Sequence, residues 1–226
     1  MRLNFHLVLL VSLMTACSDP GSGIDPVLEH FPLELSNSWE YDVVENTYSA
    51  AGINTLSYTL LDSITKVDED LYGNRTFEVS RYIWDGNSLM WQLQDIYTVN
   101  KVLKQVLEDH ANVPEISFVY PPKEGKSWDA NAYNTQGEKI YTMRGVDSDH
   151  SVEGTTYSGT VEVVKSDNED LIVHLERESE YFARNVGMIE NVFQSYFFCQ
   201  EPSCLGQQEI EAGRDSRWIL VHYRIN

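Results

Sequence analysis

The stretch SNSWEYDVVENTY at residues 36–48 shows the pattern that decides the fold. Trp39, Tyr41 and Val43 alternate with acidic side chains, so an extended chain carries one apolar face and one charged face. Similar segments follow to the C-terminus, and they are rich in the β-branched and aromatic residues that pleated strands prefer. We therefore predict a mostly β protein, with an antiparallel, strongly curved sheet or open barrel and one or two short helices.

The last of these segments reads RWILVHYRIN and spans residues 217–226. In an extended chain Trp218 and Leu220 lie on one side, and Ile219 and Val221 lie on the other. Because both faces are apolar, the pattern predicts a strand inside the sheet rather than at its edge.

A motif that begins with an aromatic residue and proline and ends in Ser-Trp occurs twice. It reads FPLELSNSW at 31–39 and YPPKEGKSW at 120–128, and shorter matches follow both copies in the same order. Proline prevents the preceding residue from being helical and suits the start of a strand. The copies end at Trp39 and Trp128, which we expect either to pack in the core or to form an aromatic platform for a ligand.

The order of these matches favours an internal duplication. We predict a single β domain over residues 31–226, made of tandem halves at about 31–119 and 120–226 with four or five strands each. Before this domain we expect a signal peptide at residues 1–16 and a polar tether with Pro and Gly at residues 17–30.

The N-terminus indicates export and lipid attachment. Arg2 precedes an apolar run at residues 5–14, which is too short to span a bilayer and is typical of a signal peptide. The sequence LMTAC, which ends at Cys17, resembles the lipobox of bacterial lipoproteins. Ordinary secretory cleavage is the alternative, but it needs a small residue where Met14 stands. The resemblance implies that Cys17 becomes the first mature residue and carries acyl chains, two of which suffice for stable anchoring.

The resemblance also implies a location and a membrane contact. Ser18 follows the lipidated cysteine, and in the usual sorting rule serine at this position favours the outer membrane. We therefore expect a cell-envelope protein that is held to the membrane through its N-terminal lipid, with the outer membrane as its location.

Acidic residues dominate the composition. The chain has 16 Lys and Arg residues against 35 Asp and Glu residues, which gives a net charge of −19. Such a surface repels phosphate backbones, so the charge argues against nucleic acid as a partner. An acidic surface attracts divalent cations or simply keeps the protein soluble.

Cys199 and Cys204 remain once Cys17 is assigned to lipid. The oxidising envelope permits a disulfide between them, and Pro202 suits the turn that they enclose. Two cysteines with no nearby histidine form an incomplete zinc set, so we expect no metal here.

One acidic segment is a candidate site. HLERESE at residues 174–180 places four polar side chains on one strand face, a candidate cation or ligand face: His174, Glu176, Glu178 and Glu180. The simpler interpretation is a solvated strand face. The sequence shows none of the common hydrolase, metalloprotease or nucleotide-binding motifs. We therefore expect no catalytic residues, no metal and no cofactor, and a protein that is not an enzyme.

The segment at residues 99–109 is ambiguous. Its aliphatic residues recur at helical spacing, which favours a short helix. A hairpin that turns at Asn100–Lys101 is the alternative.

Two segments resemble a family of predicted lipoproteins from Bacteroidota-type bacteria. FPLELSNSWEY at 31–41 is similar to their F-P-L…G-N-x-W-x-Y opening, and YFARNVGMIE at 181–190 is similar to a later motif of theirs. This chain has Ser36 and Asn185 where that family usually has glycine. The resemblance implies an antiparallel, mostly β envelope protein related to curved half-barrel lipoprotein carriers, and it supplies no catalytic residues.

These observations support three hypotheses about function. The first is a non-catalytic, lipid-anchored envelope protein that binds a protein partner or stabilises an envelope complex. The second is a carrier or sensor of an apolar ligand held in a concave sheet. The third is a surface protein that binds or cleaves glycans with exposed tryptophans, for which Trp84, Trp91 and Trp218 are the candidates.

Overall fold

The computed structural model describes residues 29–170 and 172–226. These residues form twelve antiparallel strands in one sheet. The strands are β1 (Ser38–Ser49), β2 (Gly52–Glu69), β3 (Arg75–Trp84), β4 (Gln92–Val102), β5 (Gln105–His110), β6 (Val113–Val119), β7 (Ser127–Asp129), β8 (Ile140–Val152), β9 (Thr155–Asp170), β10 (His174–Ala183), β11 (Gly187–Phe198) and β12 (Ile210–Arg224). The predicted mostly β, strongly curved fold is confirmed. The expectation of one or two helices was wrong, because the described residues contain none.

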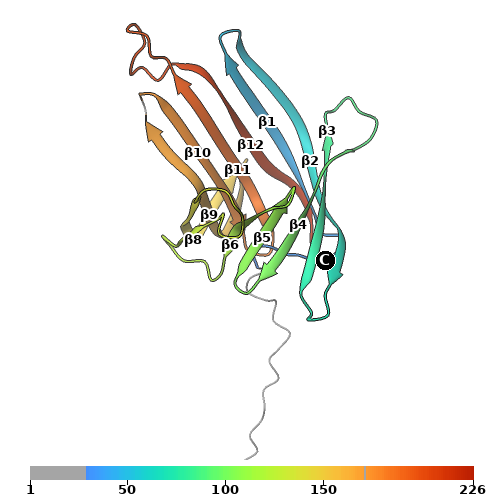
Figure 1. Cartoon of the computed structure of the whole chain (residues 1–226). Coiled ribbons are helices and arrows are strands. Elements are labelled where there is room, and N and C mark those ends of the chain that lie inside the picture. Colours follow the sequence, from blue (N-terminus) through green and yellow to red (C-terminus); the bar gives the residue numbers. More distant parts are fainter. Residues whose placement is uncertain (1–28, 171) are drawn as a thin grey trace, which may run out of the picture.

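The sheet curls into a nearly closed barrel (Figure 1). Each strand pairs with the next strand in the chain, except that β6 and β7 lie at the two edges of the sheet, and β1 pairs with β12 as well as with β2. Single hydrogen bonds connect the two edges. Ile116 N donates to Ala130 O at 2.9 Å, and Trp128 Nε1 donates to Ile116 O at 2.7 Å. Because β12 lies between β1 and β11, the prediction that the last segment is an interior strand is confirmed.

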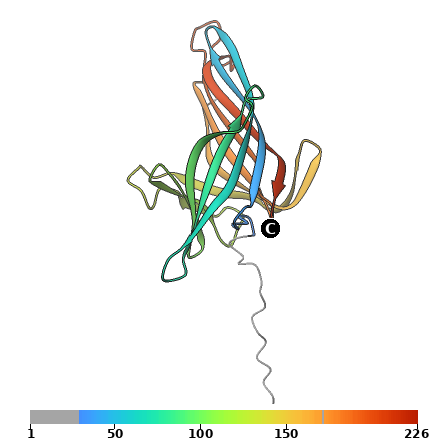
Figure 2. The ribbon, with the colours of Figure 1, turned by 90° about the vertical axis from the view of Figure 1, so that its right-hand side faces the viewer.

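The barrel wall is higher on one side than on the other. Strands β2 and β12 have 18 and 15 residues, whereas β5 and β7 have six and three. The long strands therefore project beyond the short ones (Figures 1 and 2). Because each strand reverses direction, the β2–β3, β4–β5, β6–β7, β8–β9 and β10–β11 turns all lie at one end of the barrel. We call this the closed end, and the opposite one the open end.

The segment before β1 crosses the closed end. Phe31 packs against Phe118 of β6 and Phe182 of β10, with ring centroids 5.5 and 4.8 Å apart. Trp39 Nε1 donates to Val186 O at 2.6 Å, so its ring is fixed between the segment and the β10–β11 turn. Phe31 and Trp39 are both buried, which explains why an aromatic residue and a tryptophan flank the proline here.

The two predicted halves correspond to equal numbers of strands. Residues before Tyr120 form β1 to β6, and residues after it form β7 to β12, so each half has six strands instead of four or five. The descent of the halves from one duplicated unit stays a prediction.

Residues 99–109 form a hairpin, so the preferred helix was wrong. Strand β4 ends at Val102 and β5 begins at Gln105, with Leu103 in the left-handed region at a φ of 56°. The turn therefore lies three residues beyond the expected hairpin turn. Val99 and Val106 are buried on neighbouring strands. Two period-two patterns joined by a two-residue turn imitate helical spacing, which explains the error.

The predicted disulfide is present. Cys199 and Cys204 are bonded in the loop between β11 and β12, with their Cα atoms 5.9 Å apart. No helix in the described part of the chain is long and apolar enough to span a membrane.

Candidate functional site

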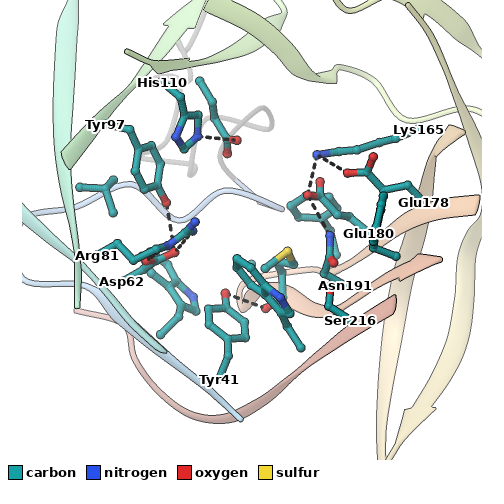
Figure 3. A pocket seen from close by; sticks show the side chains of 18 of the residues that line it. Tyr41, Asp62, Arg81, Tyr97, His110, Lys165, Glu178, Glu180, Asn191 and Ser216 are labelled. Atoms are coloured by element: carbon teal, nitrogen blue, oxygen red, sulfur yellow. Dashed lines mark hydrogen bonds and ion pairs between the residues drawn. The ribbon is translucent and has the colours of Figure 1, made fainter. Parts of the chain in front are cut away.

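The barrel encloses a cavity of about 580 Å³. Charged side chains lie on two opposite walls, and open space separates them (Figure 3). One wall carries Asp62, Arg81 and Tyr97, which we call the Arg81 group. The other carries Lys165, with Glu178 and Glu180 beside it, which we call the Lys165 group.

The Arg81 group is a fixed ion pair between aromatic rings. Arg81 Nε and Nη2 donate to the two carboxylate oxygens of Asp62 at 2.7 and 2.6 Å, and Tyr97 Oη donates to the same carboxylate at 3.1 Å. The guanidinium carbon lies 4.9 Å from the ring centroid of Trp218 and 5.2 Å from that of Tyr97. Burial, followed by the charge of Asp62, raises the pKa of Tyr97 well above its usual value, so its hydroxyl remains a donor. This wall is preorganised and electrically neutral.

The Lys165 group depends on a β-bulge. In β9 one extra residue lies opposite Glu178 and Ser179, which shifts the register at Lys165. Lys165 Nζ lies 2.6 Å from Glu180 Oε1 and 3.9 Å from Glu178 Oε1. Asn191 Nδ2 donates to Glu180 at 3.4 Å. The ammonium is thus bound tightly to one carboxylate and loosely to a second.

The Lys165 group has more carboxylates than its single ammonium can neutralise. Burial alone would lower the pKa of Lys165, but the charges of Glu180, Tyr141, Glu178 and Glu108 raise it, so the ammonium stays protonated. Burial and the charge of Glu180 raise the pKa of Glu108, although Lys165 partly offsets them. Burial also raises the pKa of Glu178, with Lys165 opposing and Glu180 adding to the shift. Two carboxylates therefore contact one ammonium, and the charge of Glu108 adds to theirs from farther away.

Replacing Glu108 with glutamine is expected to stabilise the protein near neutral pH. Its raised pKa means that the folded state binds a proton more readily than the unfolded chain, so ionisation costs stability as the pH rises above the ordinary carboxyl value. We expect a gain of about 1 kcal/mol or less at about pH 7, which disappears below about pH 4. Urea unfolding of both proteins at the two pH values measures it.

Glu176→Gln is the matched control for this prediction. Glu176 is a glutamate of β10 that is exposed, so its replacement should change the unfolding free energy by less than about 0.5 kcal/mol. A Glu108→Gln protein that is less stable than the parent near neutral pH would contradict the proposed cost of the buried carboxylate.

The cavity as a whole is acidic and aromatic. Seven of its lining residues are acidic and three are Arg or Lys. The acidic residues are Glu45, Asp62, Glu108, Glu115, Glu178, Glu180 and Asp215. Among the described residues, Glu108 and Glu178 make only long contacts with cationic or titratable partners, at 4.0 Å to His110 and 3.9 Å to Lys165. The rings of Tyr41, Tyr97 and Trp218 lie on the same surface. Carboxylates and aromatic faces both attract positive charge.

His30 lies at the closed end of the cavity and is only 1% exposed. Its Nε2 lies 3.3 Å from the carbonyl oxygen of Gly159, which requires Nε2 to be the protonated nitrogen. Burial lowers the pKa of His30, so the ring is neutral and Nδ1 is an acceptor. Within residues 29–170 and 172–226 this Nδ1 has no hydrogen-bond partner. A ligand that donates an N–H bond would satisfy it.

The candidate acidic row is divided by the structure. Glu178 and Glu180 line the cavity, but His174 and Glu176 are not among its lining residues. Glu178 and Glu180 therefore face the cavity inside the barrel, not a strand face on its outer surface. Lys165, a cation supplied by the chain, contacts both carboxylates. The described part of the chain holds no group of three His, Cys, Asp or Glu side chains suited to a metal ion.

The candidate tryptophans do not form one platform. Trp39 lines the cavity, whereas Trp128 does not line it and packs against Tyr141 with ring centroids 5.9 Å apart. The rings of Trp84 and Trp91 lie 6.3 Å apart but are inclined at 49°, so they do not provide the coplanar surface expected for a glycan. Cys17, the predicted lipidation site, lies outside the described residues.

Sequence reasoning missed most of the cavity's charged residues, although a signal for them exists. Asp62, Arg81 and Lys165 each occupy the inward position in an alternating strand, as in Phe77-x-Val79-x-Arg81. A charged residue in an apolar row indicates a buried partner. The identity of that partner depends on strand pairing, which the sequence does not show.

Comparison with known proteins finds a similarity in structure but none in sequence. No family model matches the chain. No curated protein sequence matches it either. Among solved structures, the chain is similar to a crystal structure described as "a putative lipoprotein from Parabacteroides distasonis ATCC 8503". The two chains share 13% sequence identity with a TM-score of 0.38, and the match covers 86% of this chain and 98% of the other.

Proposed function

We propose that this chain is a non-catalytic, lipid-anchored cell-envelope protein whose barrel binds a small organic cation. The cavity of about 580 Å³ with its excess of carboxylates is the observation that carries the proposal, because its volume lies in the range of small-molecule sites. It favours the second of the three hypotheses over the first and third. It also changes the expected ligand from apolar to positively charged.

The arrangement of the walls suggests how such a ligand would bind. An ammonium group between Glu108 and Glu178 would neutralise the two carboxylates that lack a close cation. An apolar or aromatic body would then lie against Tyr97 and Trp218, whose rings already flank the guanidinium of Arg81. An anion would meet the surplus negative charge without compensation, so the cavity should discriminate by charge.

The proposal describes binding rather than chemistry. The raised pKa of Lys165 keeps its amine protonated, and a protonated amine is not a nucleophile. The anchoring part of the proposal rests on the lipobox resemblance, which predicts a lipid on Cys17, and on Ser18, which favours the outer membrane.

Two ligands of similar shape and opposite charge test the proposal. We expect isothermal titration calorimetry to detect binding of phenethylammonium and none of phenylacetate, because the two differ chiefly in the sign of their charge. Glu178→Gln should weaken phenethylammonium binding at least about 10-fold, since a hydrogen bond to a charged group contributes about 1.5–3 kcal/mol. Trp218→Ala should weaken it about 5-fold through loss of the ring against which the aromatic body of the ligand packs, since an aromatic pair contributes about 0.5–1.5 kcal/mol.

Glu176→Gln, which removes an exposed carboxylate of the same strand, should leave the affinity unchanged. Equal affinity for the cation and the anion would refute selection by charge. Loss of affinity in the Glu176→Gln protein would show that binding reports total charge and not the cavity.

A further inference from the structure

Three lysines gather at the closed end of the barrel. Lys104 lies in the β4–β5 turn, and Lys123 and Lys126 lie in the β6–β7 loop. The two turns are held together because Tyr120 N donates to Lys104 O at 2.7 Å. The loop is itself closed by a bond from Lys126 N to Lys123 O at 3.0 Å. This places three positive charges on one part of an otherwise acidic protein.

These lysines have no carboxylate within ion-pair distance in the described part of the chain. By contrast, Lys66, Lys139 and Lys165 each contact an Asp or Glu. Burial, followed by the charges of Lys104 and Lys123, lowers the pKa of Lys126, so the three ammonium groups are close enough to repel one another. In a chain of net charge −19 such a cluster is a local region of opposite sign, which attracts anions.

The one carboxylate of this loop is engaged elsewhere. Glu124 Oε2 accepts a hydrogen bond from Val146 N of β8 at 3.1 Å. Lys126 Nζ donates to Pro121 O at 3.2 Å, which fixes the side chain within the loop. With the charge of Glu124 included, the β4–β5 turn and the β6–β7 loop carry three positive charges and one negative charge, which leaves a net charge of +2.

Exposed apolar side chains accompany the lysines. Leu103, which precedes Lys104 at the tip of the β4–β5 turn, is 85% exposed. Leu71 and Tyr72 project fully from the β2–β3 turn at the same end. An aliphatic side chain beside a lysine, as Leu103 is beside Lys104, is a combination found at membrane–water interfaces.

We propose that the closed end docks on a membrane surface of anionic lipid headgroups, through Lys104, Lys123, Lys126 and Leu103. Charge complementarity identifies the partner, because headgroup phosphates supply the anions that the described residues do not. The position at which the tether joins the barrel supports the same partner. Asn185 N donates to the carbonyl oxygen of Glu29 at 2.5 Å, and Glu29 Oε2 lies 3.2 Å from Arg184 Nε. The chain therefore joins the barrel at the β10–β11 turn of this end.

The tether is short enough to hold this end near the membrane. Twelve residue steps separate Cys17 from Glu29, and they span at most roughly 40 Å when fully extended. This inference rests on the proposed lipid anchor, but it does not depend on the cavity or its ligand. Docking would direct the open end of the barrel away from the lipid.

Fluorescence on vesicles tests the orientation. The full lipidated chain with Leu103→Cys is labelled with the environment-sensitive dye NBD and reconstituted in vesicles of phosphatidylcholine with or without phosphatidylglycerol. We expect a blue-shifted emission and quenching by doxyl lipids in the phosphatidylglycerol vesicles only. Asn87→Cys, in the β3–β4 loop at the open end, is the matched label and should show neither effect.

Charge reversal supplies the second arm. Attraction of each lysine to an anionic surface corresponds to about a fivefold effect, and glutamate adds repulsion, so Lys104→Glu, Lys123→Glu and Lys126→Glu together should lower the docked-to-undocked ratio by more than about 100-fold. The dye at position 103 would then report water. Retained dye immersion in the triple variant, or equal immersion in both vesicle types, would overturn the proposal.

Vesicle flotation separates this inference from the anchor on which it rests. Protein that floats with the vesicles while its dye at position 103 stays in water would refute docking and leave the anchor intact. Protein that floats with neither vesicle type would overturn the anchor and the docking surface together, whereas failed cation binding by a docked protein would refute the cavity proposal alone.

Discussion

Replacing Arg81 with methionine is expected to lower the free energy of unfolding by about 3–5 kcal/mol, because it leaves the Asp62 carboxylate buried without its ion-pair partner. Asp62 is only 5% exposed, and Arg81 supplies two of its three hydrogen bonds from side chains. The guanidinium also fills the space between the rings of Tyr97 and Trp218. For a domain of this size the loss corresponds to a fall in Tm of roughly 10 °C. Urea unfolding and thermal scans measure it.

The double variant Asp62→Leu with Arg81→Met separates the two parts of this effect. It removes the stranded charge, so most of the lost stability should return, as is common when buried ion pairs are replaced by apolar residues of similar volume. Arg81→Lys keeps the charge but not the paired geometry, and it should fall between the parent and Arg81→Met. If Arg81→Met costs less than about 1 kcal/mol, the ion pair does not hold this wall together.

Replacing Lys165 with methionine is expected to cost about 3 kcal/mol near neutral pH, because Glu178 and Glu180 lose the ammonium that contacts them both. The loss should shrink as the pH falls. Without Lys165 the carboxyl pKa values of Glu108 and Glu178, already raised by burial, rise further. The folded state then binds more protons than the unfolded chain over a wider range, so the stability of the variant increases on acidification through that range.

Denaturant unfolding between about pH 4 and about pH 8 measures this dependence. The double variant Lys165→Met with Glu180→Gln removes the carboxylate that binds the ammonium most closely, and it should recover part of the loss at neutral pH. Lys165→Arg keeps the charge and should be the mildest change. A loss for Lys165→Met that is constant across the pH range would show that packing, and not charge, determines the effect.

Much of the strand pattern is readable from the sequence, because alternation is local. The pattern Trp39-x-Tyr41-x-Val43 predicts one inward face, and all three side chains are at least 92% buried. The same reasoning places Arg81 beside Phe77 and Val79, where the structure has it. Local alternation therefore recovers which side chains enter the barrel.

Strand partners and cavity geometry depend on long-range pairing and were not predictable. Asp62 and Arg81 face each other because β2 and β3 pair in one register, and a bulge in β9 sets the position of Lys165 against β10. Neither feature leaves a local mark in the sequence. The hairpin at residues 99–109 shows the same limit, since a two-residue turn there converts an apparent helical pattern into two strands.

The pairing of β1 with β12 has a consequence for biogenesis. Tyr41 lies opposite Leu220, so β1 completes its hydrogen bonds only with a strand that is synthesised much later than β1 itself. Contacts between such distant parts of a chain form late and slowly in folding. If the chain is exported, it would therefore remain unclosed until β12 has been translocated, which keeps it compatible with a secretion channel that passes only unfolded polypeptide.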